Sequence, residues 1–215
     1  MIDKYDTLIK NLTNNNFRVT YLEKIDELIP YLKTQMLPTS TVAVGGSVSL
    51  FETGLIDFLR SSEFKFLDRY QEGADVDKIF HDTFNAKYYF SSANAITENG
   101  EIYNIDGNAN RVAAISFGPE HVYLVVSTNK IVANLKEAAL RVKRVAAPLN
   151  AKRLKLNTPC AKLGHCINDS IDENELMCNG QHHCQNTICA NIQILSRQRN
   201  KDRIEVILIN ERFGY

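Results

Sequence analysis

The sequence lacks a net charge, a long apolar run and a recognisable targeting segment. Lys plus Arg and Asp plus Glu both number 25, so no overall field attracts nucleic acid or an anionic membrane. No apolar run approaches the roughly 20 residues that cross a bilayer. Residues 1–6 are charged and lack the apolar core of a secretory signal. We therefore expect a cytoplasmic protein that binds neither nucleic acid nor a membrane.

The sequence also has few prolines and no internal repeat or low-complexity tract. Of its 215 residues, 44% are hydrophobic, 23% are charged and 5 are proline, as in an ordinary globular protein. This length supports one sizeable core but is short for two. We expect residues 1–215 to form one domain, with a Cys/His-rich excursion at residues 157–190 within it.

Strand-like and helix-like patterns alternate along the chain. Apolar residues recur at helical spacing in residues 2–12, 22–32, 50–59, 76–84, 110–115 and 134–146. Short apolar or alternating runs occupy residues 17–21, 41–44, 64–66, 88–90, 101–105, 121–126, 191–195 and 203–209. Such alternation implies right-handed βαβ units. We predict an α/β fold with a mostly parallel open sheet, helices on both faces, and the last two runs as its final strands.

Two local features refine this prediction. An Asn-Gly turn at residues 99–100 predicts a hairpin between the runs at 88–90 and 101–105. The helix at 134–146 should end before Pro148, with Val145 on its inward face. It belongs to a basic stretch that continues to Lys155, which we interpret as a solvated surface.

A glycine turn follows the apolar strand at residues 41–44. Gly45, Gly46 and Ser47 join this strand to a helix, at the sheet edge where open α/β sheets bind ligands. Glycine lets backbone N–H groups approach a phosphate or carboxylate closely, and the Ser47 hydroxyl can donate a further hydrogen bond. A tight turn with Ser47 as the N-cap explains the same residues. We predict a site for a small anionic metabolite here.

Polar residues concentrate again between the apolar strands that follow. Glu98, at the Asn-Gly turn, has the chemistry of a nucleophile or a general base. Asp106 can orient a ligand hydroxyl, and Arg111 can hold a carboxylate through two hydrogen bonds. A hairpin turn at Glu98 and a helix cap at Asn108 would explain the pattern without a ligand. The candidate site residues are Glu98 as catalytic residue and Gly45, Gly46, Ser47, Asn94, Asp106, Asn108 and Arg111 as ligand-binding residues.

Seven segments together resemble the lactate-utilization (LUD-domain) family, and they follow the family's order along nearly the whole chain. They are Val-Gly-Gly-Ser at 44–47, Ala-Asn-Ala-Ile-Thr-Glu-Asn-Gly at 93–100, Asp-Gly-Asn at 106–108, Asn-Arg-Val-Ala at 110–113, Ala-Ala-Pro-Leu-Asn-Ala-Lys-Arg at 146–153, Thr-Pro-Cys at 158–160 and Val-Ile-Leu-Ile-Asn-Glu at 206–211.

The resemblance implies the fold of ribose-5-phosphate isomerases, glucosamine-phosphate deaminases and CoA-transferases. In that superfamily a glycine-rich loop after an early strand handles phosphate or the CoA-bearing substrate. Residues 97–100 also resemble the Ser-Glu-Asn-Gly box of class I CoA-transferases, whose glutamate forms the acyl intermediate, which would assign that role to Glu98. Members of the LUD family are associated with oxidation of lactate to pyruvate alongside iron–sulfur partners, which implies an oxidoreductase partner for this chain.

All five cysteines lie between residues 160 and 189, interleaved with three histidines. Thiolates gathered on a polar loop suit zinc or an iron–sulfur cluster. No Cys-x2-Cys pair is present, so neither a zinc ribbon nor a ferredoxin pattern is matched. A redox-active thiol pair and inert cysteines are the alternatives. The predicted ligands are Cys160, Cys166, Cys184 and Cys189, with Cys178, His182 or His183 as replacements for one of them.

Three functions are compatible with these features. The first is a zinc or iron–sulfur accessory protein in lactate and pyruvate oxidation that binds a small anion at the glycine turn. The second is an isomerase or an acyl- or CoA-transferase that uses Glu98. The third is a metabolite-sensing module without turnover. Whether the chain forms a homo-oligomer stays open.

Overall fold

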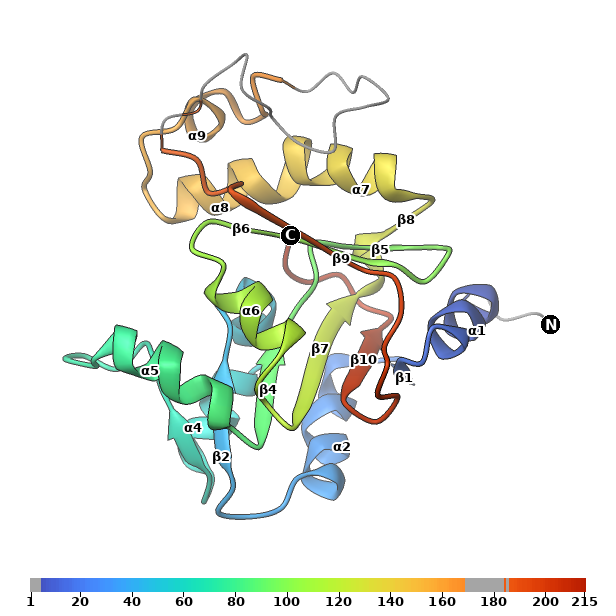
Figure 1. Ribbon diagram of the computed structural model, residues 1–215, viewed down its shortest axis with the longest axis vertical. Coiled ribbons are helices and arrows are strands. Elements are labelled where there is room, and N and C mark those ends of the chain that lie inside the picture. Colours follow the sequence, from blue (N-terminus) through green and yellow to red (C-terminus); the bar gives the residue numbers. More distant parts are fainter. Residues whose placement is uncertain (1–4, 169–183, 185) are drawn as a thin grey trace.

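The computed structural model describes residues 5–168, 184 and 186–215. Its centre is a six-stranded sheet in which every strand is parallel to its neighbours (Figure 1). In spatial order the strands are β1 (Arg18–Leu22), β10 (Ile204–Ile209), β7 (His121–Ser127), β4 (Tyr88–Ser91), β2 (Thr41–Val44) and β3 (Lys65–Leu67). The predicted α/β fold with a mostly parallel sheet is confirmed.

A second, four-stranded sheet lies above the central one in Figure 1. Its order is β8 (Ile131–Val132), β5 (Ala95–Thr97), β6 (Ile102–Asp106) and β9 (Asn191–Leu195). The hairpin predicted at the Asn-Gly turn is formed by β5 and β6, so its first strand is not residues 88–90. Those residues belong to β4, which is buried along its whole length as a central parallel strand should be.

The prediction that residues 191–195 extend the central sheet is wrong. β9 pairs antiparallel with β6 at the edge of the second sheet. None of its residues is fully buried, whereas every residue of β10 is. A half-exposed strand suits a sheet edge, and only a strand apolar on both faces suits the centre of a covered parallel sheet.

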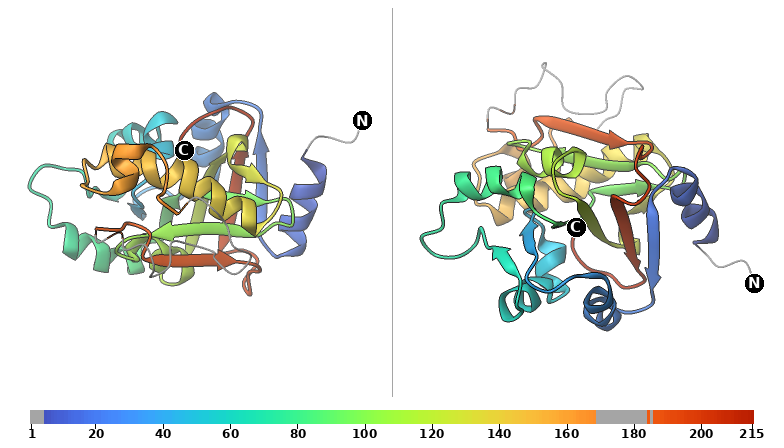
Figure 2. Two further views of the ribbon diagram at one scale, coloured as in Figure 1. Left: turned by 90° about the horizontal axis from the view of Figure 1, so that it is seen from above. Right: turned by 60° about the horizontal axis from the view of Figure 1, so that its bottom comes forward.

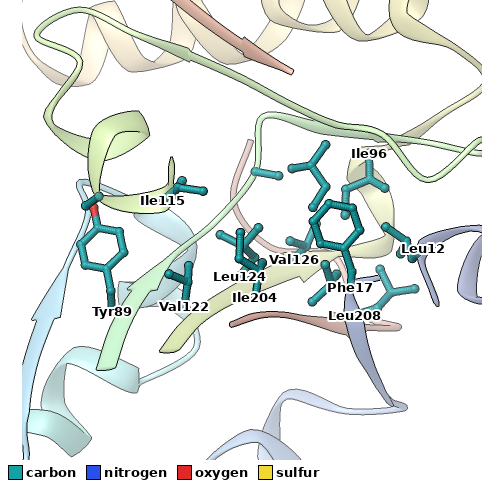
Figure 3. Close-up of a cluster of buried hydrophobic side chains, with 14 of the residues drawn as sticks. Leu12, Phe17, Tyr89, Ile96, Ile115, Val122, Leu124, Val126, Ile204 and Leu208 are labelled. Carbon is teal, nitrogen blue, oxygen red and sulfur yellow. The ribbon is translucent and has the colours of Figure 1, made fainter. Parts of the chain in front are cut away.

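Helices cover both faces of the central sheet because its strands are apolar on both sides. Along β7, Val122, Leu124 and Val126 enter one core cluster, and Tyr123 and Val125 enter another. The first cluster, shown in Figure 3, lies beneath the hairpin, α1 (Asp6–Asn14) and α6 (Asn110–Ser116). The second packs against α2 (Leu28–Gln35), α3 (Val48–Glu52) and α4 (Leu55–Ser61).

A third helical layer covers the outer face of the second sheet (Figures 1 and 2). It contains α7 (Leu135–Arg141), the π-helical segment η4 (Val142–Ala146), α8 (Ala147–Arg153) and α9 (Pro159–Leu163). The remaining elements are α5 (Val76–Asp82) and the short 3-10 helices η1 (Ile25–Glu27), η2 (Thr83–Asn85) and η3 (Thr128–Lys130). No helix in the described part of the chain is long and apolar enough to span a membrane.

The helix predicted at residues 134–146 does not end before Pro148. It continues through η4 into α8, and Pro148 occupies the first turn of α8. The wider π turn rotates the following side chains around the helix axis. Val145, predicted to face inward, is therefore 37% exposed, whereas Ala146 and Ala147 are buried.

Candidate functional site

A cavity of about 250 Å³ lies at the carboxyl ends of the central strands. Its walls include residues that follow four of these strands within three positions: Gly46 after β2, Arg69 after β3, Ser92 after β4 and Lys130 after β7. From β2 the chain crosses to β3 on one side, and from β4 it leads on to β7 on the other. Adjacent strands whose connections diverge in this way leave a crevice at the sheet edge, where α/β proteins bind ligands.

Most of the predicted ligand-binding residues line this one cavity. They are Gly46, Ser47, Asn94, Asp106, Asn108 and Arg111. Segments some 60 residues apart in the sequence thus meet at one sheet edge. Some of these side chains, such as Asp106 and Arg111, already make hydrogen bonds within the protein.

The protein holds Arg111 through both terminal nitrogens of its guanidinium, which together make four hydrogen bonds. Its Nη1 donates to Ser92 O at 3.2 Å and to Asn104 Oδ1 at 2.8 Å. Its Nη2 donates to Asn94 Oδ1 at 3.0 Å and to Ile105 O at 2.6 Å. The guanidinium therefore ties the wall together and contributes positive charge, and it cannot clamp a carboxylate through two hydrogen bonds without giving up these partners.

Asp106 caps a helix in this structure. Its carboxylate accepts hydrogen bonds from the backbone N–H groups of Gly107, Arg111 and Val112 at 3.0–3.1 Å. It also lies 3.9 Å from Arg111 Nε. The cap expected at Asn108 is thus supplied by Asp106, and exposed Asn108 is left at the cavity wall.

Close packing leaves no room for a side chain at Gly45, the first glycine of the turn. A Cβ on buried Gly45 would lie 2.7 Å from Tyr89 Oη, 3.0 Å from Ser91 Oγ and 3.1 Å from Arg111 Cγ. A Cβ on Gly46 would meet only Arg69, at 3.6 Å from Nη1. Ser47 occupies the N-cap position of α3 but makes no capping hydrogen bond with its side chain. Gly46 and Ser47 therefore form the part of the turn that faces the cavity.

Glu98 lies outside the cavity. It is exposed at the tip of the β5–β6 hairpin, where its carbonyl accepts a hydrogen bond from Asn11 Nδ2 at 2.8 Å. Its N–H donates to Val132 O at 2.9 Å. The structure therefore does not bring the predicted catalytic carboxylate together with the glycine turn.

Lys130 is the main cavity residue that the sequence analysis missed. It is only 2% exposed, and its Nζ donates to Ser49 Oγ at 2.8 Å and to Ser92 Oγ at 3.1 Å. Burial lowers the pKa of Lys130 to about 7, assisted by the nearby charges of Arg141 and Arg111 and opposed by Glu52. Lys130 comes four residues after the apolar strand at 121–126, and no sequence pattern distinguishes it from an ordinary surface lysine.

Two more cations were missed or misinterpreted. The guanidinium of Arg69 lies over the ring of Phe80, 4.6 Å from its centroid. Arg153, from the basic stretch interpreted as a solvated surface, donates to Asn150 Oδ1 and to Tyr215 Oη at the cavity mouth. The same stretch contributes Lys143, which is 1% exposed, so the interpretation as a solvated surface is wrong there.

The four predicted metal ligands line a second, smaller cavity of about 20 Å³. Cys160, Cys184 and Cys189 are free thiols. Burial raises the pKa of Cys189 to about 12, with a further contribution from Cys160. The described residues contain no group of three or more His, Cys, Asp or Glu placed to hold a metal ion. Cys178, His182 and His183 lie outside the described residues.

The two cavities share a wall. Ala147, Thr187, Ile188 and Cys189 line both of them. A Cβ on Gly107, in the loop before α6, would lie 3.4 Å from the Cα of Ile188. Residues 187–189, before β9, therefore form part of the wall between the two cavities, and Cys189 belongs to that wall.

Gly45→Ala should destabilise the fold by about 1–3 kcal/mol, the usual effect of a methyl group forced into a packed site. The added Cβ meets Tyr89, Ser91 and Arg111 at 3.1 Å or less. Gly46→Ala is the matched control and should change stability by about 0.5 kcal/mol or less, because its nearest neighbour lies at 3.6 Å. Urea denaturation of the three proteins measures both effects. Equal losses of stability in the two variants would contradict the conclusion that close packing requires glycine at position 45 but not at position 46.

Lys130→Met should change the pH dependence of stability in a defined direction. Because the pKa falls from 10.5 to about 7 on folding, the unfolded chain binds more protons between these values. The stability of the wild type relative to the variant must then rise with pH over that range, by at most about 1.4 kcal/mol per pH unit. Urea denaturation at about pH 6, 7.5 and 9 tests this. A stability difference that does not change with pH would contradict the lowered pKa of Lys130.

Comparison with known proteins places this geometry in a family. A family model described as the LUD domain matches residues 5–209. No curated protein matches the sequence. The crystal structure of a DUF162 family protein from Deinococcus radiodurans is similar, with a TM-score of 0.51 and 11% sequence identity over 95% of this chain and 94% of that chain. At this identity the likeness establishes the fold alone, but the family model spans nearly the whole sequence, and the chain belongs to the LUD-domain family.

Proposed function

We propose that the protein binds a small anionic metabolite in the cavity at the glycine turn. One observation carries this proposal: the charges that line the cavity do not balance. Among the described residues that line it, Arg69, Arg111 and Arg153 are cations, Lys130 is a cation when protonated, and Asp106 has the only carboxylate side chain. That carboxylate already accepts three backbone hydrogen bonds. An anion with a carboxylate or phosphate group would supply the missing negative charge.

Three of the four cations keep their charge uncompensated. Among the described residues, Arg69, Lys130 and Arg153 have no carboxylate within ion-pair distance. Their partners are aromatic rings, hydroxyl groups and an amide oxygen. These partners orient the cationic groups without neutralising them, which favours a site prepared for an anion.

The size of the cavity limits the ligand. About 250 Å³ is just below the usual range for pockets that hold drug-sized ligands, so a metabolite of a few carbon atoms suits it best. The family's association with lactate oxidation makes lactate and pyruvate the first carboxylates to test. We further propose that the protein acts in that oxidation beside an iron–sulfur oxidoreductase.

An acyl- or CoA-transferase that uses Glu98 is not favoured by the geometry. Its position on an exposed turn outside the cavity separates the proposed nucleophile from the anion site. A non-catalytic, metabolite-sensing role differs from the proposal only in the absence of turnover, and it uses the same cavity.

Arg69→Gln and Arg153→Gln should each weaken anion binding about tenfold or more, because a hydrogen bond to a charged group contributes about 1.5–3 kcal/mol. Isothermal titration calorimetry with phosphate, lactate and pyruvate measures this. Arg199→Gln is the matched control, since exposed Arg199 lies outside the cavity and its loss changes the net charge equally. If all three substitutions weaken binding alike, or if none of these anions binds, the proposal fails.

We also propose that the cysteine cavity holds zinc or an iron–sulfur cluster. The support is that the free thiols of Cys160, Cys184 and Cys189, drawn from segments up to 29 residues apart, line one small cavity together with Cys166, and soft thiols are the ligands these metals prefer. Cys166 is disulfide-bonded in the structure, so it would have to be reduced before it could serve as a ligand. The described residues do not by themselves complete a ligand set, so a further ligand would have to come from Cys178, His182 or His183 or from a rearrangement of the four. When bound, a cluster would supply electron transfer and zinc a structural link.

Anaerobically purified protein should contain stoichiometric zinc or iron by elemental analysis. Cys160→Ser and Cys189→Ser should lose the metal, because each removes a thiol from the cavity. Cys178→Ser discriminates between the possible ligand sets. If the ligands are Cys160, Cys166, Cys184 and Cys189, as predicted, the Cys178→Ser variant should keep the metal. Wild-type protein without stoichiometric metal would overturn this part of the proposal.

A further inference from the structure

Lys130 has an unusual environment for a buried lysine. Its two hydrogen-bond acceptors are neutral hydroxyl groups, Ser49 Oγ and Ser92 Oγ, and all three residues line the anion cavity. Buried ammonium groups are normally paired with a carboxylate. No described carboxylate lies within ion-pair distance of Lys130 Nζ.

We infer that Lys130 is a carbonyl-reactive amine, whose nitrogen forms an imine with the carbonyl carbon of an anionic carbonyl compound held in the cavity. The inference rests on the proposed anion site and narrows its ligand class. Arg69, Arg111 and Arg153 line the same cavity and attract the anionic group. A 2-oxo acid carries a carboxylate next to its carbonyl. It is therefore the smallest kind of compound that offers a carboxylate to the arginines and a carbonyl to Lys130.

The packing around Lys130 directs its amine toward the cavity. A Cβ on Gly214 would lie 3.2 Å from Lys130 Nζ and 2.1 Å from Ser49 Oγ, so the segment at 213–215 packs directly against the amine. Asn129 Nδ2 holds this segment through hydrogen bonds to the carbonyl oxygens of Phe213 and Gly214. Lys130 is thereby covered on the side of this segment, and Ser49 and Ser92 fix its nitrogen at the cavity wall.

The charges near Lys130 favour the neutral amine, which is the nucleophilic form. Arg141 and Arg111 are nearby cations from α7 and α6, and Glu52 of α3 is the nearby anion. Burial, assisted by Arg141 and Arg111 and opposed by Glu52, lowers the pKa of Lys130 to about 7, so that a large fraction of the amine is neutral near physiological pH. An exposed lysine, with a pKa of roughly 10.4, is almost entirely protonated there.

The reaction balances without an oxidant or a reductant. The lone pair of the neutral Nζ forms a C–N bond with the carbonyl carbon, and the carbonyl π electrons move to oxygen, which takes up a proton. The nitrogen loses a proton, and the resulting carbinolamine releases its oxygen as water to give the C=N bond. Ser49 and Ser92, at hydrogen-bond distance from Nζ, can accept from the nitrogen and donate to the departing oxygen.

Reductive trapping tests the inference on the full-length protein. Wild-type protein is incubated separately with pyruvate, glyoxylate and 2-oxoglutarate in the presence of sodium borohydride, and peptides are mapped by mass spectrometry. We expect one stable reduced adduct, on Lys130. Lys78, an exposed lysine of α5, is the internal reference for non-selective reaction. Labelling of Lys78 to the same extent as Lys130, or no adduct on Lys130 with any of the three acids, would overturn the inference.

Two further measurements sharpen this test. Lys130→Arg should abolish the adduct, whereas Lys78→Arg should leave labelling unchanged. The rate of adduct formation on Lys130 should rise through about pH 7, because the neutral fraction of the amine grows there. A rate that rises only above about pH 9, as for an exposed lysine, would contradict the inference.

Calorimetry separates this inference from the proposed function. If wild-type protein binds phosphate and gains no adduct on Lys130, the imine is excluded and the anion site stands. If it binds no anion and gains no adduct, both fail. If a variant fails to fold, mass-spectrometric mapping of the adduct on the wild-type protein is sufficient to test the inference.

Discussion

The hydrogen bonds of the Arg111 guanidinium hold the wall of the cavity together. Its two terminal nitrogens bond to residues after β4, within β6 and directly before β5, so one buried side chain joins both sheets to α6. The absence of a side chain at Gly45 provides the space in which Arg111 Cγ packs. The glycine turn and the arginine thus depend on each other, and the first glycine belongs to the framework of the site.

This framework leaves the cavity with an excess of positive charge. Arg111 is satisfied by neutral oxygens, and the one carboxylate that lines the cavity caps α6. Arg69 and Arg153 are oriented by a ring and an amide and keep their charges, and Lys130, held by hydroxyl groups, adds a positive charge when it is protonated. The cysteine cavity lies behind the chain at residues 187–189, which lines both sites.

The sequence predicted those features that depend on local pattern. The strand at 41–44 is β2 residue for residue, because a β-branched Thr41 and three apolar residues between Pro38 and Gly45 leave little choice. The turn at residues 99–100 was placed correctly, whereas its partner strand was not, because strand pairing depends on contacts distant in sequence. Lys130 and Arg69 were missed because a single cation after a strand has no pattern, and only the parallel register brings these residues together. The π-helical turn that reverses Val145 also left no sequence signal.

The most direct test of the account is a crystal structure of the protein grown with pyruvate or phosphate. The account predicts ligand density in the cavity after β2, with the anionic group within hydrogen-bond distance of Arg69 or Arg153 and beside Lys130, and with the Arg111 hydrogen bonds retained. Ligand bound elsewhere, or bound only after Arg111 leaves its partners in the wall, would contradict it.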